Sequence, residues 1–285
     1  MSLEILVAIA AAAALGLAAL AAVIWLRRRR WLRRVRRASG RVGPRYPVVL
    51  LHGLFGFDEL GIGPARLAYF RGLTQRIQRV GADVHRLRVA RTGSVAARAQ
   101  QLTRRIEQLS AKRVNIIAHS MGGLDARYAI ARLGLSKRVA SLITIGTPHH
   151  GTPLADLGTH LLGEKLGLRR ALAVLGKEVA AFYDLTTARM PAFNEEVSDA
   201  RDVWYASVVA HTTGRSVHPF LWPTHRYLSE RHGPNDGVVP LASQAWGEVI
   251  AELEADHWAQ IGWSRHFDAA ELFEQLMREL RARGF

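Results

Sequence analysis

The sequence predicts an α/β fold with a mostly parallel central sheet and helices on both faces. Between residues 47 and 145, short apolar runs rich in β-branched residues alternate with longer segments of helix-forming residues. In addition, residues 114–126 (VNIIAHSMGGLDA) are typical of a buried strand that passes directly into a helix through a turn of small residues. Strands that are connected through helices in this way lie parallel, with right-handed crossovers.

The predicted elements follow one another in a regular order along the chain. A leucine-rich, partly amphipathic helical segment is expected between about residues 154 and 189, and residues 211–233 are expected to form an irregular loop. The predicted strands are 47–51, 84–89, 114–118, 141–145, 203–209 and 248–253, and the other predicted helices are 66–80, 95–109, 122–133 and 267–283.

Ser120 stands at the tight turn between a strand and a helix. Such a turn exposes the serine hydroxyl at the carboxyl end of the sheet, above the amino end of the next helix. The main-chain N–H groups and the helix dipole at that place can stabilise a developing oxyanion. An ordinary helix cap is the alternative interpretation. The strand before Ser120 and the helix after it favour a catalytic serine.

Three segments carry a resemblance to a known family. Residues 46–58 (YPVVLLHGLFGFD), 114–128 (VNIIAHSMGGLDARY) and 145–152 (IGTPHHGT) resemble bacterial triacylglycerol lipases of the α/β-hydrolase fold. In the family pattern G-x-S-x-G, Ala118 replaces the first glycine, and alanine fits where only bulk is excluded. The resemblance spans roughly residues 46–263. It implies an acyl-ester hydrolase with a helical cap or lid inserted at about 152–200.

A serine hydroxyl needs an imidazole to take its proton and a carboxylate to orient that imidazole. In this fold the three residues follow the order serine, acid, histidine. His257 comes after strand 248–253, where the last strand delivers the base, and His266 at the start of the terminal helix is the runner-up. Asp236 lies in the turn PNDG before an apolar pair, whereas the alternative Asp256 adjoins His257 and is poorly placed to face it. The predicted triad is Ser120, Asp236 and His257.

The segment HGLFG after strand 47–51 predicts the second half of an oxyanion hole, because glycines let its backbone approach the substrate carbonyl. The predicted donors are the backbone N–H groups of Leu54 and Met121. His52 is expected to hold this loop in shape by a hydrogen bond, and His119 is not expected to face the nucleophile. Asp125 is expected to pair with an arginine.

The chain contains no cysteine, which excludes a thiol nucleophile and a thiolate metal site. Many related bacterial lipases bind calcium through an aspartate two residues after the catalytic histidine. Here that position is Ala259, and the next carboxylate is Asp268. We therefore expect no calcium site, no other metal site and no cofactor.

Residues 5–26 form an uncharged apolar stretch of 22 residues, long enough to span about 30 Å of hydrocarbon as a helix. A cleaved signal peptide would place positive charge before this stretch, but the four preceding residues include no Lys or Arg. Eight arginines follow between residues 27 and 37, so the positive-inside rule places the rest of the chain in the cytoplasm. We predict a single-pass membrane anchor and linker over 1–45 and a catalytic domain over 46–285.

The net charge of +15 is concentrated near this anchor. Ten arginines and no acid lie between residues 27 and 45, so most of the excess is a local patch suited to anionic lipid headgroups. This distribution argues against nucleic acid as a partner. The expected function is a membrane-anchored serine hydrolase that cleaves lipid esters. The alternatives are an acyltransferase or phospholipase on the same fold, or a non-catalytic membrane-tethered scaffold.

Overall fold

The computed structural model describes residues 43–54, 59–60, 67–166, 177–264 and 266–285. The chain divides into two compact units, Met1–Gly40 and Arg41–Phe285, and the described residues belong to the second. The predicted membrane anchor lies outside the described residues. Within the part of the chain that is described, no helix combines the length and the apolar character that crossing a membrane requires.

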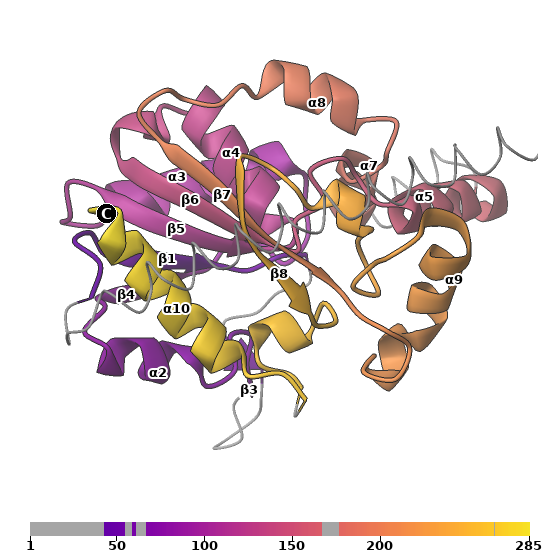
Figure 1. Cartoon of the computed structure of the whole chain (residues 1–285). Helices are drawn as coiled ribbons and strands as arrows, with labels where there is room; N and C mark the ends of the chain where they lie inside the picture. The colour runs from indigo at the N-terminus through magenta and orange to yellow at the C-terminus, as the bar shows by residue number, and fades with distance from the viewer. Residues whose placement is uncertain (1–42, 55–58, 61–66, 167–176, 265) are drawn as a thin grey trace, which may run out of the picture. The chain divides into compact units, whose positions relative to one another are not determined.

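A six-stranded parallel sheet forms the centre of the second unit (Figure 1). The strand order is β4-β1-β5-β6-β7-β8, and each neighbouring pair is parallel, as predicted. A separate antiparallel pair joins β2 (Glu59–Leu60) to β3 (Leu67–Ala68). The six strands are β1 (Val48–Leu51), β4 (Val84–Leu87), β5 (Val114–His119), β6 (Val139–Ile145), β7 (Trp204–His211) and β8 (Glu248–Glu254).

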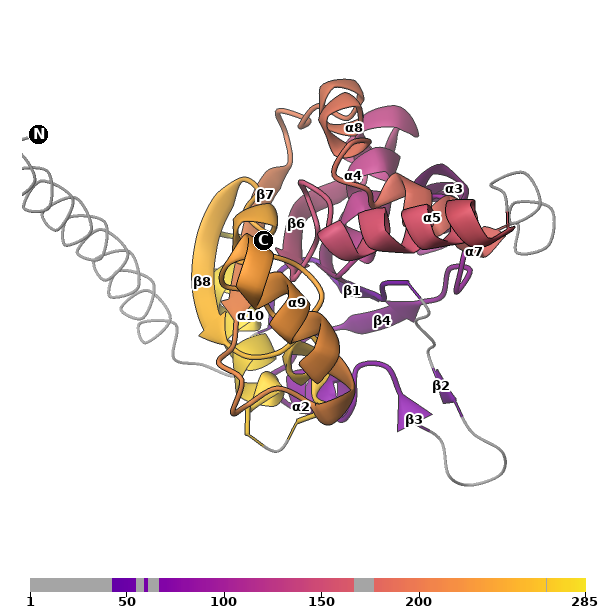
Figure 2. The same ribbon diagram turned by 90° about the vertical axis from the view of Figure 1, so that its right-hand side faces the viewer.

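Helices cover both faces of the sheet, and the inner strands β1, β5 and β6 are buried along their whole length. Figures 1 and 2 show α3 (Val95–Glu107) and α4 (Gly122–Arg132) on one side of the sheet. On the other side, α2 (Leu73–Arg79) and α10 (Ala269–Ala282) pack against each other. One apolar core cluster lies between the α3–α4 pair and the strands.

Local sequence signals set the ends of these helices. Ser94 caps α3 by accepting the backbone N–H of Ala97 at 3.3 Å, and Asp268 caps α10 by accepting that of Glu271 at 3.0 Å. The helix predicted at 66–80 is shorter than expected. Gly72 precedes α2 in a left-handed conformation with φ 72°, so the helix cannot extend further back.

The segment between β6 and β7 is helical, with α5 (Pro153–Leu166), α7 (Lys177–Asp184) and α8 (Met190–Glu196). The irregular loop predicted at 211–233 was wrong in part. It contains a short 3-10 helix, η2 (Pro219–Leu221), and the helix α9 (Trp222–His232). A proline in the first turn suits a helix start, and buried His225 and Leu228 give α9 an inner face.

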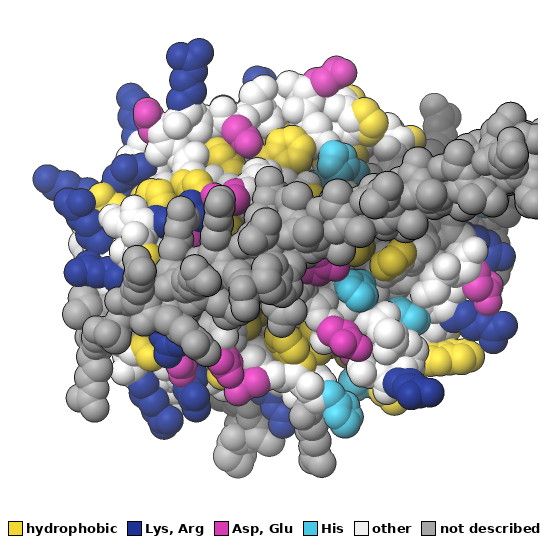
Figure 3. Space-filling view, viewed as in Figure 1, with side chains coloured by type: hydrophobic (Ala, Val, Ile, Leu, Met, Phe, Trp, Pro, Cys, Tyr) yellow, Lys and Arg dark blue, Asp and Glu magenta, His cyan; other side chains and the backbone are white. Residues whose placement is uncertain are grey.

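Charged side chains are mixed on the face drawn in Figure 3. Lys and Arg side chains project mainly from the left-hand edge, and Asp and Glu side chains lie across the same face. The His side chains visible in this view lie in its right-hand half, toward which the β8 arrow points in Figure 1. That side corresponds to the carboxyl ends of the strands.

Candidate active site

Ser120 lies between β5 and α4 in a strained backbone conformation. It is the one non-glycine residue with a positive φ, 56°, in the described ranges. Three hydrogen bonds hold it there. Its N–H donates to the Ile145 carbonyl at 2.9 Å, and its carbonyl accepts the Thr147 hydroxyl at 2.7 Å and the Gly123 N–H at 3.0 Å. The predicted strand–turn–helix geometry around the serine is therefore present.

Glycines allow residues 52–54, the described part of the HGLFG loop, to approach this turn. A Cβ atom on Gly53 would lie 2.6 Å from the Cβ and 3.0 Å from the Oγ of Ser120. A Cβ atom on Gly122 would lie 2.8 Å from the carbonyl oxygen of His52. Larger residues would push the loop away from the serine hydroxyl. The loop expected to supply an oxyanion donor thus adjoins Ser120.

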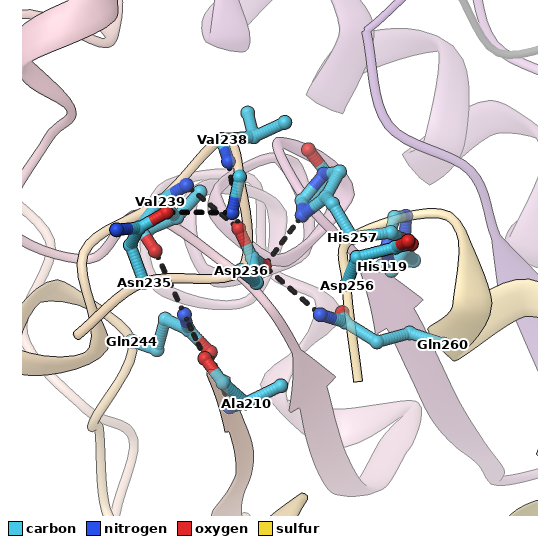
Figure 4. Close-up of polar contacts among 12 residues, drawn as sticks. His119, Ala210, Asn235, Asp236, Val238, Val239, Gln244, Asp256, His257 and Gln260 are labelled. Atoms are coloured by element: carbon cyan, nitrogen blue, oxygen red, sulfur yellow. Dashed lines mark hydrogen bonds and ion pairs between the residues drawn. The ribbon is translucent and has the colours of Figure 1, made fainter. Parts of the chain in front are cut away.

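Asp236 and His257 meet as the sequence predicts. His257 Nδ1 donates to Asp236 Oδ2 at 2.7 Å, and both side chains are buried (Figure 4). The other carboxylate oxygen, Oδ1, accepts the N–H groups of Val238 at 2.9 Å and Val239 at 2.8 Å. The His257 N–H donates to the Asp236 carbonyl at 2.8 Å. The turn that carries Asp236 is thus fixed to the loop that carries His257.

Gln260 is a site residue that the sequence reasoning missed. Its side-chain amide donates to Asp236 Oδ2 at 2.9 Å, beside the bond from His257. Gly146, at the end of β6, makes room for this contact. A Cβ atom there would lie 2.3 Å from Gln260 Oε1 and 3.1 Å from Asp236 Oδ2. The sequence contains one signal for this contact. Gln260 is three positions after His257, and residues three apart in a helical turn lie on the same side of it.

The competing acid and base have other roles. Asp256 accepts the backbone N–H groups of His218 at 2.7 Å, Trp258 at 2.9 Å and Ala259 at 2.7 Å. It therefore ties the β7–α9 connection to the loop after β8. His266 is exposed, and its backbone N–H donates to the Ser264 hydroxyl. Among the described residues, neither side chain is hydrogen-bonded to Asp236 or His257.

A buried ion pair supports the HGLFG loop. Arg98 and Asp125 are fully buried, and their guanidinium and carboxylate approach to 2.7 Å, which agrees with the predicted arginine partner of Asp125. The same guanidinium donates to the carbonyls of His52 at 3.0 Å and Gly53 at 3.2 Å. Burial raises the pKa of Asp125 to about 6, and the charge of Arg98 opposes that rise.

His52 also shapes this loop, as predicted. The Val89 N–H donates to its Nε2 at 3.3 Å, so the ring proton is on Nδ1, which donates to the Gly53 carbonyl at 2.9 Å. Both ring nitrogens are thus occupied by backbone groups. Met121 lies at the N-cap of α4, where the helix offers its N–H no acceptor, and Leu54 follows Gly53 beside the serine. The two predicted oxyanion donors belong to the loop after β1 and to the start of α4, and both segments adjoin Ser120.

Within the described ranges, no group of three or more His, Cys, Asp or Glu side chains has the arrangement of a metal site. The expectation that no calcium is bound stays a prediction. It depends on Ala259, which stands where related lipases have a calcium-binding aspartate.

Comparisons with known proteins place the chain in a family. A family model for palmitoyl protein thioesterase matches residues 47–182. Triacylglycerol lipase 2 of Saccharomyces cerevisiae is 30% identical over 267 residues, covering 77% of this chain and 81% of that protein. A triacylglycerol lipase of Pseudomonas fragi is 29% identical over 297 residues, covering 85% of this chain and 98% of that protein.

Solved structures agree with the fold. A metagenomic carboxyl esterase superposes with a TM-score of 0.69 at 19% identity, covering 84% of this chain and 76% of its own. The mature form of a Bacillus licheniformis lipase superposes with a TM-score of 0.65 at 21% identity, and the match covers 84% of this chain and 92% of that lipase. The chain therefore belongs to the triacylglycerol lipase family and is an ester hydrolase with the α/β-hydrolase fold.

Proposed function

We propose that the protein hydrolyses lipid esters through the triad Ser120, Asp236 and His257 and an acyl-enzyme intermediate. The observation that carries this proposal is the buried 2.7 Å hydrogen bond from His257 Nδ1 to Asp236 Oδ2. It fixes the tautomer in which Nε2 is free to accept a proton. Ser120 is supported by its strained turn at the same edge of the sheet.

The reaction proceeds in two halves. The Ser120 hydroxyl oxygen attacks the ester carbonyl carbon while its proton passes to His257 Nε2, and Asp236 stabilises the imidazolium. The N–H groups of Leu54 and Met121 hold the oxyanion of the tetrahedral intermediate. His257 then returns the proton to the leaving alkoxide as the C–O bond breaks. A water molecule repeats the sequence on the acyl-enzyme, releasing the fatty acid and the serine.

We further propose that residues 5–26 anchor the protein in a membrane with the catalytic domain on the cytoplasmic side. The apolar length of this stretch and the eight arginines after it support the proposal. An anchored enzyme meets its substrate at the lipid surface, so membrane lipids, phospholipids included, are as suitable as triacylglycerol. A reporter fused after Phe285 that is active only outside the cytoplasm would refute this topology.

The test of the triad is turnover of p-nitrophenyl esters of increasing acyl length by the full chain, with and without detergent micelles. Ser120→Ala should lose at least about 10³-fold in kcat. Turnover that rises with chain length at the micelle surface supports a lipase with a working lid, and turnover limited to short soluble esters supports an esterase. Full activity in Ser120→Ala contradicts the mechanism.

Thioester hydrolysis is a second candidate, favoured by the match of residues 47–182 to the thioesterase family model. The acyl-enzyme would be the same, and only the leaving group would change from an alkoxide to a thiolate. Comparing palmitoyl-coenzyme A with a palmitoyl oxygen ester separates the two. An acyltransferase instead shows ester formation when a long-chain alcohol is added as the acceptor.

A further inference from the structure

His119 is buried against the ring of His257, the proposed base. Its role could not be assigned from the sequence. Its ring centroid lies 4.4 Å from that of His257, and the side chain is 1% exposed. Figure 4 shows the two rings side by side. Although it adjoins Ser120 in the chain, His119 uses both ring nitrogens for other contacts. Nδ1 lies 2.7 Å from the Tyr69 hydroxyl, and Nε2 lies 3.1 Å from the His257 carbonyl oxygen.

The partners determine where each proton lies. The His257 carbonyl oxygen can only accept, so the proton of the neutral His119 ring is on Nε2, which donates to it. His119 Nδ1 is then unprotonated and accepts the Tyr69 hydroxyl proton. The Gly53 N–H in turn donates to the Tyr69 hydroxyl oxygen at 3.2 Å. The result is an unbroken series of three hydrogen bonds with one consistent direction.

Burial keeps these groups in the protonation states that the series requires. Desolvation, and then the neighbouring His257, lower the pKa of His119 well below its ordinary value of 6.5, so the ring is neutral. Burial raises the pKa of Tyr69, so its hydroxyl keeps its proton. A neutral ring beside His257 also avoids placing a like charge against the imidazolium that forms during catalysis.

The series joins two loops that are far apart in the sequence. One end is Gly53, in the loop that supplies the proposed oxyanion donor of Leu54, and the other is the backbone of His257. Tyr69 is held in turn, because the Trp263 indole donates to its carbonyl at 2.9 Å. The oxyanion loop and the base are thus connected through the side chains of Tyr69 and His119.

We propose that Tyr69 and His119 are positioning residues, which hold the oxyanion loop and the catalytic histidine at a fixed separation. The inference rests on the proposed triad and goes beyond it. Each acts through a backbone group that it binds, Tyr69 through the Gly53 N–H and His119 through the His257 carbonyl. Loss of the series lets the two loops shift relative to each other, and shifts of about 1 Å at a reacting centre lower rates about 100-fold.

The experiment measures kcat and KM on a p-nitrophenyl ester for the full chain in detergent micelles. An alkylphosphonate p-nitrophenyl ester, which bonds to the serine oxygen and releases one p-nitrophenolate, counts the working sites. Tyr69→Phe should lower kcat per titrated site by about 10- to 100-fold with little change in KM. The matched control is Tyr205→Phe. Tyr205 is also a buried tyrosine whose hydroxyl accepts a backbone N–H, from Ala200 at 3.1 Å, but it lies at the amino end of β7.

A second pair of variants separates positioning from packing. Gln at position 119 keeps an N–H that can reach the His257 carbonyl, whereas Leu fills the buried space without any donor. We expect His119→Gln to retain at least about fivefold more kcat than His119→Leu, because a lost buried partner is costly. If the ring only fills space, apolar Leu is the better replacement and the order is reversed.

The outcomes separate this inference from the triad itself. It is overturned if Tyr69→Phe stays within about twofold of the wild type, if Tyr205→Phe loses as much kcat, or if His119→Leu matches His119→Gln. Should Tyr69→Phe yield no titratable sites, the comparison at position 119 decides. If the wild type is not titrated by the phosphonate, or Ser120→Ala keeps its activity, the proposed triad fails, and this inference fails with it.

Discussion

Replacing Asp236 by Asn tests the acid of the triad, and replacing Asp256 by Asn provides its control. In Asp236→Asn, the amide oxygen can still accept the N–H groups of Val238 and Val239, which places the NH₂ group toward His257 Nδ1. The imidazole must then carry its proton on Nε2 and cannot take one from Ser120. We expect kcat to fall about 10³- to 10⁴-fold, and the upper value corresponds to about 5.5 kcal/mol.

Asp256→Asn should behave differently, because this carboxylate accepts only backbone N–H groups. Its new NH₂ group would face the His218 N–H, which leaves a buried donor unpaired and lowers the free energy of unfolding by about 1–3 kcal/mol. Its kcat should stay within about fivefold of the wild type. The assay combines p-nitrophenyl ester turnover with urea unfolding. Asp236 is not the acid if Asp256→Asn shows the large loss of kcat while Asp236→Asn keeps more than a tenth of the activity.

Three further predictions follow from buried contacts. Gly146→Ala should lower both stability and kcat, since φ is 56° and the new methyl would contact Gln260 Oε1 at 2.3 Å; unchanged turnover would contradict this. Asp125→Ala should lower the free energy of unfolding in urea by about 3–5 kcal/mol, because it leaves the Arg98 guanidinium buried without a counter-charge. Stability should fall as the pH drops through 6.5, since burial lowers the pKa of His149 in the folded state and the unfolded chain then binds more protons. In thermal unfolding at several pH values, His149→Asn should flatten this slope by up to about 1.4 kcal/mol per pH unit.

The sequence predicted those parts of the fold that local patterns determine. Strands such as 114–118 are buried on both faces, so their apolar runs were easy to identify. Helix α9 was missed because its buried face consists of few residues, among them a histidine, between exposed aromatic and polar residues. Periodicity gives a weak signal where the inner face of a helix is narrow and partly polar.

In the candidate site too, local sequence patterns predicted some residues and gave no signal for others. Asp236 and His257 were predicted from their order in the chain and their place after a turn or a strand. The contacts of Gln260 with Asp236 and of Tyr69 with His119 depend on side chains that meet only after folding. Tyr69 lies 50 residues before His119, and its sequence neighbourhood carries no motif.

The topology explains why residues so distant in sequence form one site. Parallel strands place their carboxyl ends at one edge of the sheet, and β1, β5 and β8 each end within a few residues of a site loop. The Asp236 turn returns to that edge after α9, where Gln244 binds both the Val239 carbonyl and the backbone of Ala210 in β7. Hydrogen bonds to backbone groups therefore hold the Asp236 turn, the His257 loop and the serine turn to the sheet. Because the residues of the proposed triad are held to the sheet, the helices between β6 and β7 can vary with the substrate without disturbing them.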